Sequence, residues 1–277
     1  MAKFSGQTGH QHGGFHQDLR LLQSKLIERR RALALLGAGT VLAATDGSLL
    51  FPRRVEAAGR CVPDAPEIVG PYPADGTNQS QGVTSDILTE DGVVRSDIRR
   101  SFLTSTTKAK GVKVRLDFEV VNTNAGCSAL GGFAVYVWHC TRDGLYSLYT
   151  APDESYLRGV QVSDDNGRLS FVTIFPGCYP GRWPHIHAEI FTSLGEATNG
   201  RNSVLTTQLA MPKKICKSVY DNVSGYEASK FYLSEVSLKN DISFGDDTHK
   251  QLAVMTPDFE GSYEDGYRAK ATLGVPV

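Results

Sequence analysis

The stretch Val114-Arg-Leu-Asp-Phe-Glu-Val-Val121 decides the fold class, because its apolar and polar residues alternate as in a strand buried on one face. Further short, strand-like segments follow it, separated by turn residues. They are Phe133–His139, Leu169–Phe175, His185–Phe191 and Leu205–Ala210. Helix is expected only near Lys213–Val223 and Ala228–Leu233. This spacing predicts an all-β protein, an antiparallel β-sandwich core with a loop-rich periphery and few short helices.

The charge balance narrows the classes of partner. The chain of 277 residues carries 29 basic and 30 acidic side chains, which gives a formal net charge of -1. It has no basic excess with which to neutralise a phosphate backbone, so nucleic acid is not expected as a partner. The 28 glycines and 12 prolines indicate many turns, in agreement with a body built of strands and loops.

The first part of the chain has the features of an export signal. Three arginines, Arg29 to Arg31, precede a run of 13 mainly apolar residues, Ala32 to Ala44. The run is shorter than the roughly 20 residues that span a bilayer, so no stable membrane anchor is expected. We predict a leader of the twin-arginine type over residues 1–58, with its cleavage position open, and one folded domain over 59–277. Such a leader implies export into the periplasm or the cell exterior. The alternative is that the segment forms a surface helix with a basic end.

Five cysteines follow the predicted leader, and an oxidising compartment would permit disulfides among them. Their number is odd, so at least one stays unpaired within a monomer. None has the C-x-x-C spacing of a zinc knuckle, and a buried apolar thiol is the alternative for each. The pairing is left open for the whole set: Cys61, Cys127, Cys140, Cys178 and Cys216.

The segment Pro176-Gly-Cys-Tyr-Pro-Gly-Arg-Trp-Pro-His-Ile-His187 carries the strongest chemical signal. Residues two apart in a strand point to the same face, so His185 and His187 can reach one metal ion. Two hydrogen-bonded structural histidines are the alternative. Tyr179, in the turn before this strand, and Tyr146, after the strand that ends near residue 139, can supply phenols. Two imidazoles and two phenolates form a hard, anionic ligand set that favours iron(III) over iron(II) and zinc.

Between roughly Glu67 and Ala210 the chain resembles the intradiol ring-cleavage dioxygenases, which include the protocatechuate and catechol dioxygenases, and especially their exported single-domain relatives. The order and spacing of several short motifs carry the resemblance. These motifs are Gly70-Pro-Tyr-Pro73, Val137-Trp-His-Cys-Thr-Arg-Asp-Gly-Leu-Tyr-Ser147, Tyr156-Leu-Arg-Gly-Val-Gln161, Pro176-Gly-Cys-Tyr179, Gly181-Arg-Trp-Pro-His-Ile-His187 and Thr207-Gln208.

The resemblance implies a non-haem iron(III) centre and a reaction. Its ligands would be Tyr146 and His187 in the equatorial plane and Tyr179 and His185 in axial positions. The substrates would be O2 and a catechol-type aromatic, which is cleaved between its two hydroxyl-bearing carbons to a cis,cis-muconate. The resemblance also implies further site residues: Tyr179 as the ligand that takes a substrate proton, Arg182 and Gln208 beside the substrate, and Tyr72 and Trp138 in the pocket wall.

Two other classes of function remain open. Glu189 falls on the same strand face as His185 and His187, which suggests a cupin-like or other two-histidine metal site. Alternatively, the sandwich is an extracellular binding module with a vestigial metal site. The sequence does not determine the oligomeric state. It also does not determine which catechol is the substrate, because Trp183-Pro184 departs from the family pattern at the pocket wall.

Overall fold

A computed structural model describes residues 61–277, which all belong to one compact unit. The predicted leader, residues 1–58, lies outside the described residues. The strands are β1 (Asp75–Ser80), β2 (Val83–Asp86), β3 (Lys113–Asn122), β4 (Ser128–Ala129), β5 (Ala134–Trp138), β6 (Arg158–Val162), β7 (Arg168–Ile174), β8 (His185–Phe191), β9 (Leu205–Ala210), β10 (Asp258–Ser262) and β11 (Gly266–Val275). The helices are α2 (Lys213–Asn222), α3 (Glu227–Glu235) and α4 (His249–Val254).

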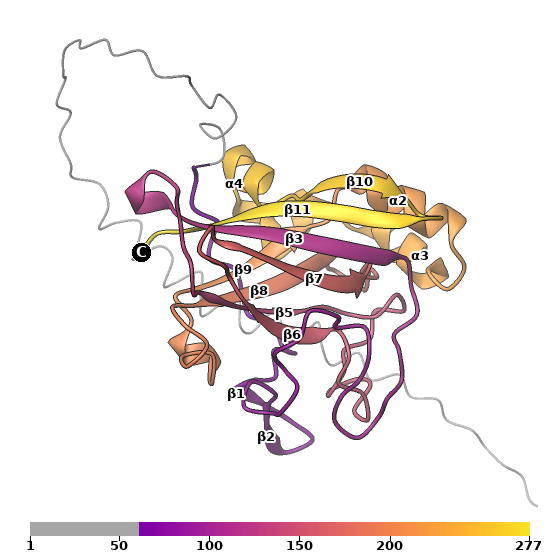
Figure 1. Cartoon of the computed structure of the whole chain (residues 1–277). Coiled ribbons are helices and arrows are strands. Elements are labelled where there is room, and N and C mark those ends of the chain that lie inside the picture. Colours follow the sequence, from indigo (N-terminus) through magenta and orange to yellow (C-terminus); the bar gives the residue numbers. More distant parts are fainter. Residues whose placement is uncertain (1–60) are drawn as a thin grey trace, which may run out of the picture. The chain divides into compact units, whose positions relative to one another are not determined.

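The strands form two stacked sheets and a separate hairpin (Figure 1). A five-stranded sheet has the order β10-β11-β3-β4, with β7 paired to β3 as well, and a four-stranded sheet has the order β6-β5-β8-β9. One hydrophobic core lies between the sheets and includes Leu116 of β3, Val137 of β5, Phe171 of β7 and Ile190 of β8. The all-β sandwich predicted from the sequence is confirmed.

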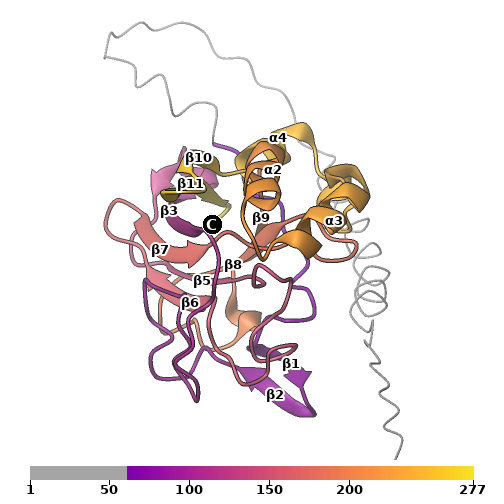
Figure 2. The same ribbon diagram turned by 90° about the vertical axis from the view of Figure 1, so that its right-hand side faces the viewer.

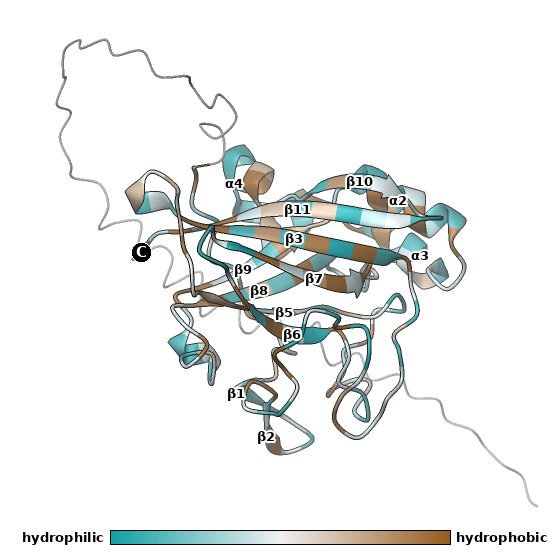
Figure 3. Cartoon of the chain, viewed as in Figure 1, coloured by the Kyte–Doolittle hydropathy of each residue, from teal (hydrophilic) through white to brown (hydrophobic). Residues whose placement is uncertain are grey.

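Strand β3 has the alternation that predicted it. Val114, Leu116, Phe118 and Val120 are buried, while the residues between them are more exposed, and the change of polarity along the strand is visible in Figure 3. One pairing departs from a purely antiparallel sandwich, because β3 and β11 run parallel. Strand β11 comes from the end of the chain, and local alternation does not encode which distant strand becomes a neighbour.

The four-stranded sheet is buried on both faces, which explains why its central strands are so apolar. Every residue of β5 and of β8 is buried. One face packs on the other sheet. The second face lies in a smaller core that contains Tyr136 and Trp138 of β5 together with Ile87 and Val93 of the coil around the β1–β2 hairpin. The polar residues of β8 that point to this second face are therefore held away from water.

The helices lie near the positions that the sequence indicates. Helix α2 spans Lys213–Asn222 and α3 spans Glu227–Glu235, close to the predicted segments, whereas α4 was not predicted. In Figures 1 and 2 the three helices lie at the opposite end of the molecule from the β1–β2 hairpin. Within residues 61–277, no helix has the length and apolar character needed to cross a bilayer.

The beginning of the described chain is tied to β3 and β11. A disulfide joins Cys61 to Cys127, which follows β3, whereas Cys140, Cys178 and Cys216 are free and buried. The sequence had left this pairing open. Nearby, the backbone N–H of Asp64 donates to the carbonyl of Gly274, and the N–H of Gly274 donates to Asp64 Oδ2 at 2.9 Å.

We predict that Asp64→Asn removes a pH-dependent loss of stability. Burial raises the pKa of Asp64 from 3.8 to about 7. Between these values the unfolded state releases a proton that the folded state keeps, so the free energy of unfolding falls as pH rises from about 4 to about 7. Across this pH window the free energy of unfolding of the variant should rise relative to that of the wild type, by a few kcal/mol at most. Urea unfolding at several pH values measures the difference, and a constant difference would contradict the prediction.

Candidate metal centre and active site

The topology brings the loops that carry the two predicted tyrosine ligands to one end of the four-stranded sheet. Strands β5 and β8 are antiparallel neighbours, so the C-terminal end of β5 lies beside the N-terminal end of β8. The loop that follows β5 carries Tyr146, and the loop that precedes β8 carries Tyr179. His185 and His187 are the first and third residues of β8. All four predicted ligands therefore start from the same end of the sheet.

The two histidines share a face of β8 with other predicted site residues. The strand register places Trp138 of β5 and Gln208 of β9 directly opposite His187. The Trp138 ring stacks on the His187 ring, with centroids 4.5 Å apart and planes at 5°. Trp138 thus lies behind His187 as its support. Gly70 also lies close to this imidazole, since a Cβ added to Gly70 would be 3.3 Å from His187 Cε1.

The donor atoms of the four predicted ligands meet. Tyr146 Oη lies 3.3 Å from His185 Nε2 and 3.4 Å from Tyr179 Oη. His185 Nε2 also lies 3.4 Å from Tyr179 Oη and 3.0 Å from His187 Nε2. Three polar atoms, from two loops and from β8 itself, thus gather around His185 Nε2.

These separations suit a shared metal ion better than they suit hydrogen bonds. Hydroxyl hydrogen bonds are usually about 2.7–2.8 Å long. Two ligand atoms that each lie about 2.0–2.1 Å from one metal are about 2.9–3.4 Å apart for angles of about 90–110°. The orientation of His185 agrees, because its Nδ1 lies 2.5 Å from the Trp183 carbonyl and must donate to it. The lone pair of His185 Nε2 therefore faces the cluster.

Burial sets the protonation states in the cluster. Burial and the charge of Arg182 lower the pKa of His185 to about 3, and burial together with His185 lowers that of His187 well below its usual value. Both imidazoles are therefore neutral and able to bind a metal. Burial and the neighbouring Tyr179 raise the pKa of Tyr146 well above its usual value. Ionising this phenol requires a highly charged cation beside it, which a trivalent metal ion would provide.

Arg182 and Gln208, both predicted from the sequence, lie next to each other in the interior. Arg182 Nη2 donates to Gln208 Oε1 at 2.6 Å, and Gln208 Nε2 donates to the carbonyl of Ile68 at 2.7 Å. Arg182 Nε also pairs with Asp241 Oδ2 at 3.0 Å. Burial acts to raise the pKa of Asp241, but Arg182, His185 and backbone hydrogen bonds together lower it, so the pair is ionic.

Similar solved structures identify the fold. An intradiol ring-cleavage dioxygenase from Tetranychus urticae matches with a TM-score of 0.58 and 21% sequence identity, over 78% of this chain and 96% of that one. A second solved dioxygenase matches with a TM-score of 0.57 and 22% identity, again over 78% of this chain and 96% of its own. This chain has the intradiol dioxygenase fold. No family model matches the sequence, and no curated protein does.

Within the intradiol dioxygenase fold, Tyr72 and Arg158 connect the N-terminal coil to the cluster. The ring of Tyr72 lies 4.8 Å from that of Tyr146, between centroids. The buried Arg158 donates to the carbonyls of Tyr72 and Pro73, each at 2.8 Å. It also donates to Ser147, through Nε to Oγ and through Nη2 to the carbonyl, both at 2.9 Å. Arg158 lies in a motif of the resemblance, although no role is predicted for it from the sequence.

A serine on α3 braces both tyrosine-bearing loops, and sequence reasoning missed it. Ser229 Oγ accepts the backbone N–H of Cys178 at 2.9 Å, and it donates to the carbonyl of Arg142 at 2.8 Å. Cys178 directly precedes Tyr179, and Arg142 lies in the loop of Tyr146. Asp241 was missed as well, since both residues follow the last segment that resembles the family. Only the Asp-x-Ser pattern of a turn marks Asp241 in the sequence.

The rival ligand set is not assembled. Among residues 61–277, no three His, Cys, Asp or Glu residues form a group that could hold a metal ion. Glu189 does share the face of His185 and His187, but its Oε1 accepts from Thr206 Oγ1 at 3.3 Å. The further polar atoms that come within 3.4 Å of His185 Nε2 are, besides His187 Nε2, the phenol oxygens of Tyr146 and Tyr179.

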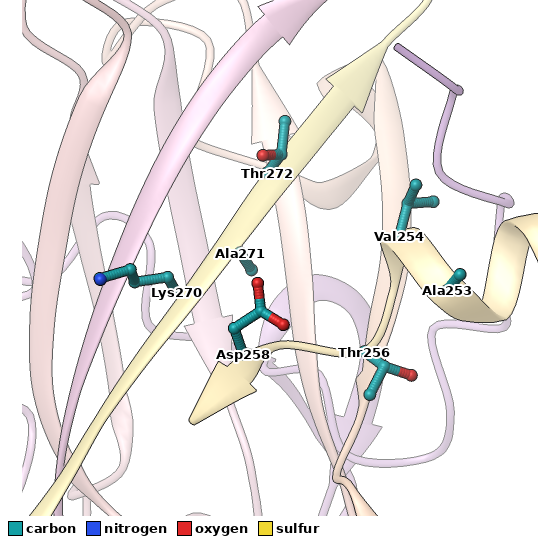
Figure 4. Close-up of a pocket in the computed structure, with 7 residues that line it drawn as sticks. All are labelled: Ala253, Val254, Thr256, Asp258, Lys270, Ala271 and Thr272. Atoms are coloured by element: carbon teal, nitrogen blue, oxygen red, sulfur yellow. The ribbon is translucent and has the colours of Figure 1, made fainter. Parts of the chain in front are cut away.

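Three cavities in the described structure lie away from the cluster. A cavity of about 30 Å³ between α4 and strands β10 and β11 is lined by residues that include Asp258 and Lys270 (Figure 4). Ligand sites usually measure about 300–1,000 Å³, so it is too small for an aromatic substrate. A hollow of about 560 Å³ lies on the charged outer face of β3, β7 and β11, and another of about 340 Å³ lies between α2 and α3. Neither is lined by a predicted site residue.

Proposed function

We propose that residues 59–277 form a non-haem iron(III) intradiol dioxygenase. In this proposal the enzyme cleaves a catechol-type aromatic between its two hydroxyl-bearing carbons, incorporates both atoms of O2 and releases a cis,cis-muconate-type product. The observation that carries the proposal is the gathering of four donor atoms, since the oxygens of Tyr146 and Tyr179 and His187 Nε2 all lie 3.0–3.4 Å from His185 Nε2. The dioxygenase fold supports it independently.

Tyr146, Tyr179, His185 and His187 would hold the iron. Bound iron(III) would act there as a Lewis acid, which favours loss of both catechol protons and draws electron density from the ring. The two imidazoles enter the site neutral, so they bind without first releasing a proton. The phenols supply the negative charge that this ligand set needs to match a trivalent ion.

Tyr179 is the ligand best placed to accept a proton from the substrate. Its side chain is partly exposed in a turn, whereas Tyr146 is only 1% exposed behind it. A bidentate substrate needs a coordination position and a base at the same moment. As a phenolate, Tyr179 would offer its Oη as the base that takes up a substrate proton.

Arg182 and Gln208 would act on charge and position in the pocket. Arg182 carries a fixed positive charge within a buried network, where its field is poorly screened. We assign it to the stabilisation of negative charge that develops on the substrate. Gln208, opposite His187 and bonded to Arg182, would then help to define the space for the substrate and O2. Tyr72 would contribute an aromatic wall.

The proposal includes export of the enzyme. The arginine cluster and the short apolar run predict a twin-arginine leader over residues 1–58. The disulfide between Cys61 and Cys127 supports this part, because disulfides persist in oxidising compartments outside the cytoplasm. The enzyme's small-molecule partners would be a catechol-type substrate and O2.

Titration of the iron-loaded protein tests the function directly. Anaerobic addition of catechol, protocatechuate or hydroxyquinol should shift the visible absorption band that iron(III)-phenolate ligation produces. Admission of O2 should then consume O2 in proportion to the catechol and form a muconate that chromatography identifies. A colourless iron-loaded protein that takes up no O2 with any of these substrates would overturn the proposal.

We predict that Tyr179→Phe lowers kcat by about 10²- to 10⁴-fold, the usual contribution of a positioned base. The variant keeps the ring in its turn but loses the phenol oxygen, so the visible band should also change. The matched control is Tyr232→Phe on α3, a partly exposed tyrosine remote from the cluster. Unchanged colour and turnover in Tyr179→Phe would remove this residue from the ligand set.

A further inference from the structure

Asp241 lies far from the predicted site in sequence but close to it in the fold. It stands in the turn between two 3-10 helices, η3 (Leu238–Asn240) and η4 (Phe244–Asp246), with its side chain completely buried. Its Oδ1 accepts the backbone N–H groups of Ser243 at 2.8 Å and Phe244 at 3.1 Å. The carboxylate is thereby fixed to its own turn, and Oδ2 is left to face Arg182.

Through Oδ2, Asp241 holds the loop that precedes β8. This oxygen accepts from Arg182 Nε at 3.0 Å and from the backbone N–H of Trp183 at 2.6 Å. The carbonyl of Trp183 in turn accepts the Nδ1 proton of His185. One carboxylate oxygen therefore fixes both a guanidinium group and the residue whose carbonyl orients a proposed ligand.

The guanidinium of Arg182 is held at a second point. Its Nη2 donates to Gln208 Oε1, and Gln208 is itself fixed by the carbonyl of Ile68. A planar guanidinium bonded through two of its nitrogens to two separate elements has little freedom to rotate. Without Asp241 the guanidinium would lose its bond at Nε, and its orientation would depend more on the bond to Gln208.

The ion pair between Arg182 and Asp241 is better explained by its effect on the orientation of the guanidinium than by its effect on stability. Two charges that leave water pay a desolvation penalty that offsets much of their attraction, and apolar replacements of both partners are often tolerated. Arg182 and Asp241 have side chains only 2% and 0% exposed. A buried pair that contributes little net stability but fixes the direction of a charged group beside a reactive centre has its main effect on geometry.

We infer that Asp241 is a positioning residue of the candidate active site, which sets the guanidinium of Arg182 and, through Trp183, the ring of His185. The inference rests on the proposed function for the role of Arg182 in turnover. The bracing itself belongs to the folded chain and can be measured without metal.

The test compares Asp241→Asn, Arg182→Gln and the double variant. Asparagine keeps the size of the side chain but loses the charge and one acceptor oxygen. In the metal-free protein, the Trp183 amide of Asp241→Asn should exchange its hydrogen at least about 10-fold faster than in the wild type. In the iron-loaded protein, kcat/KM for catechol should fall about 10- to 100-fold, through kcat more than KM.

The double variant distinguishes positioning from an independent effect. If Asp241 acts through Arg182, the double variant should lie within about three-fold of Arg182→Gln alone. The matched control is Asp221→Asn, which removes an exposed ion pair with Lys230 in the same part of the chain. It should change neither exchange nor turnover. Exchange and kcat/KM of Asp241→Asn within about two-fold of wild type would overturn the inference, whereas losses that multiply in the double variant would overturn the route through Arg182 and support the one through Trp183 and His185.

If Asp241→Asn or Arg182→Gln fails to fold, a variant with two apolar replacements takes its place. Arg182→Met with Asp241→Leu removes both charges together, which the interior tolerates better than one unpaired charge. Its Trp183 amide should also exchange faster, since leucine accepts no hydrogen bond, and slow exchange there would count against the inference. Wild-type protein that cleaves no catechol would overturn the proposed function alone, because the exchange measurement would still decide whether Asp241 braces the loop.

Discussion

His187→Ala is expected to abolish turnover and to lower iron affinity by more than about 100-fold. This loss exceeds the one usual for residues that only hydrogen-bond to a metal ligand. His187 is 2% exposed, and its Nε2 lies 3.0 Å from His185 Nε2. Its other nitrogen, Nδ1, has no hydrogen-bond partner among residues 61–277. Iron content after loading and O2 uptake with catechol measure the two effects, and circular dichroism checks that the variant folds.

Glu189→Gln provides the matched comparison, because Glu189 is buried on the same face of β8. In the proposed centre it is not a ligand, so this variant should keep its iron and colour. A protein that loses iron on Glu189→Gln, as it does on His187→Ala, would instead support a site of two histidines and a carboxylate. The two substitutions therefore separate the proposed enzyme from its closest rival.

The strands that the sequence predicts are those with an unambiguous local pattern. Strand β3 alternates, and β5 and β8 are apolar throughout because both of their faces are covered. Strand β11 was not predicted, although Tyr267, Ala269 and Leu273 alternate along it, because small and weakly apolar residues give a faint signal. Its parallel partner could not be deduced, since pairing across the chain depends on the whole packing.

The candidate site divides in the same way. Strand periodicity places His185 and His187 on one face, but it says nothing of which loops reach them. The two tyrosines came from resemblance to a family, and the structure brings their oxygens within 3.4 Å of His185 Nε2. Residues that hold the site from a distance, such as Asp241 and Ser229, have no local signal. Their contacts exist only after helices and turns from the end of the chain have packed.

The cluster is therefore held in place by the protein before any metal binds. Hydrogen bonds from Ser229 hold the two tyrosine loops, and Asp241 holds the loop that leads to β8. Buried polar groups of this kind are costly if any partner is missing. The residue with the most partners in the region, Arg158, should consequently show the largest effect on stability.

Arg158→Met is expected to lower the free energy of unfolding by about 3–5 kcal/mol, because several buried oxygens lose their donor and each unsatisfied group costs about 1–3 kcal/mol. Arg158 is 1% exposed, and its guanidinium donates to Tyr72, Pro73 and Ser147 and, at 3.0 Å, to Tyr136 Oη. Methionine fills much of the volume but offers no donor, so several buried oxygens lose their partner at once. Denaturant unfolding of the metal-free protein measures the change.

Arg168→Met is the matched control, because Arg168 begins β7 with an exposed side chain. Its free energy of unfolding should stay within about 0.5 kcal/mol of the wild type, as for most surface substitutions. Arg158→Lys should fall between the two, since an ammonium group keeps the charge but has three donors in place of five. Equal stabilities for Arg158→Met and Arg168→Met would mean that the coil around Tyr72 is held by its apolar contacts and that the buried arginine serves another purpose.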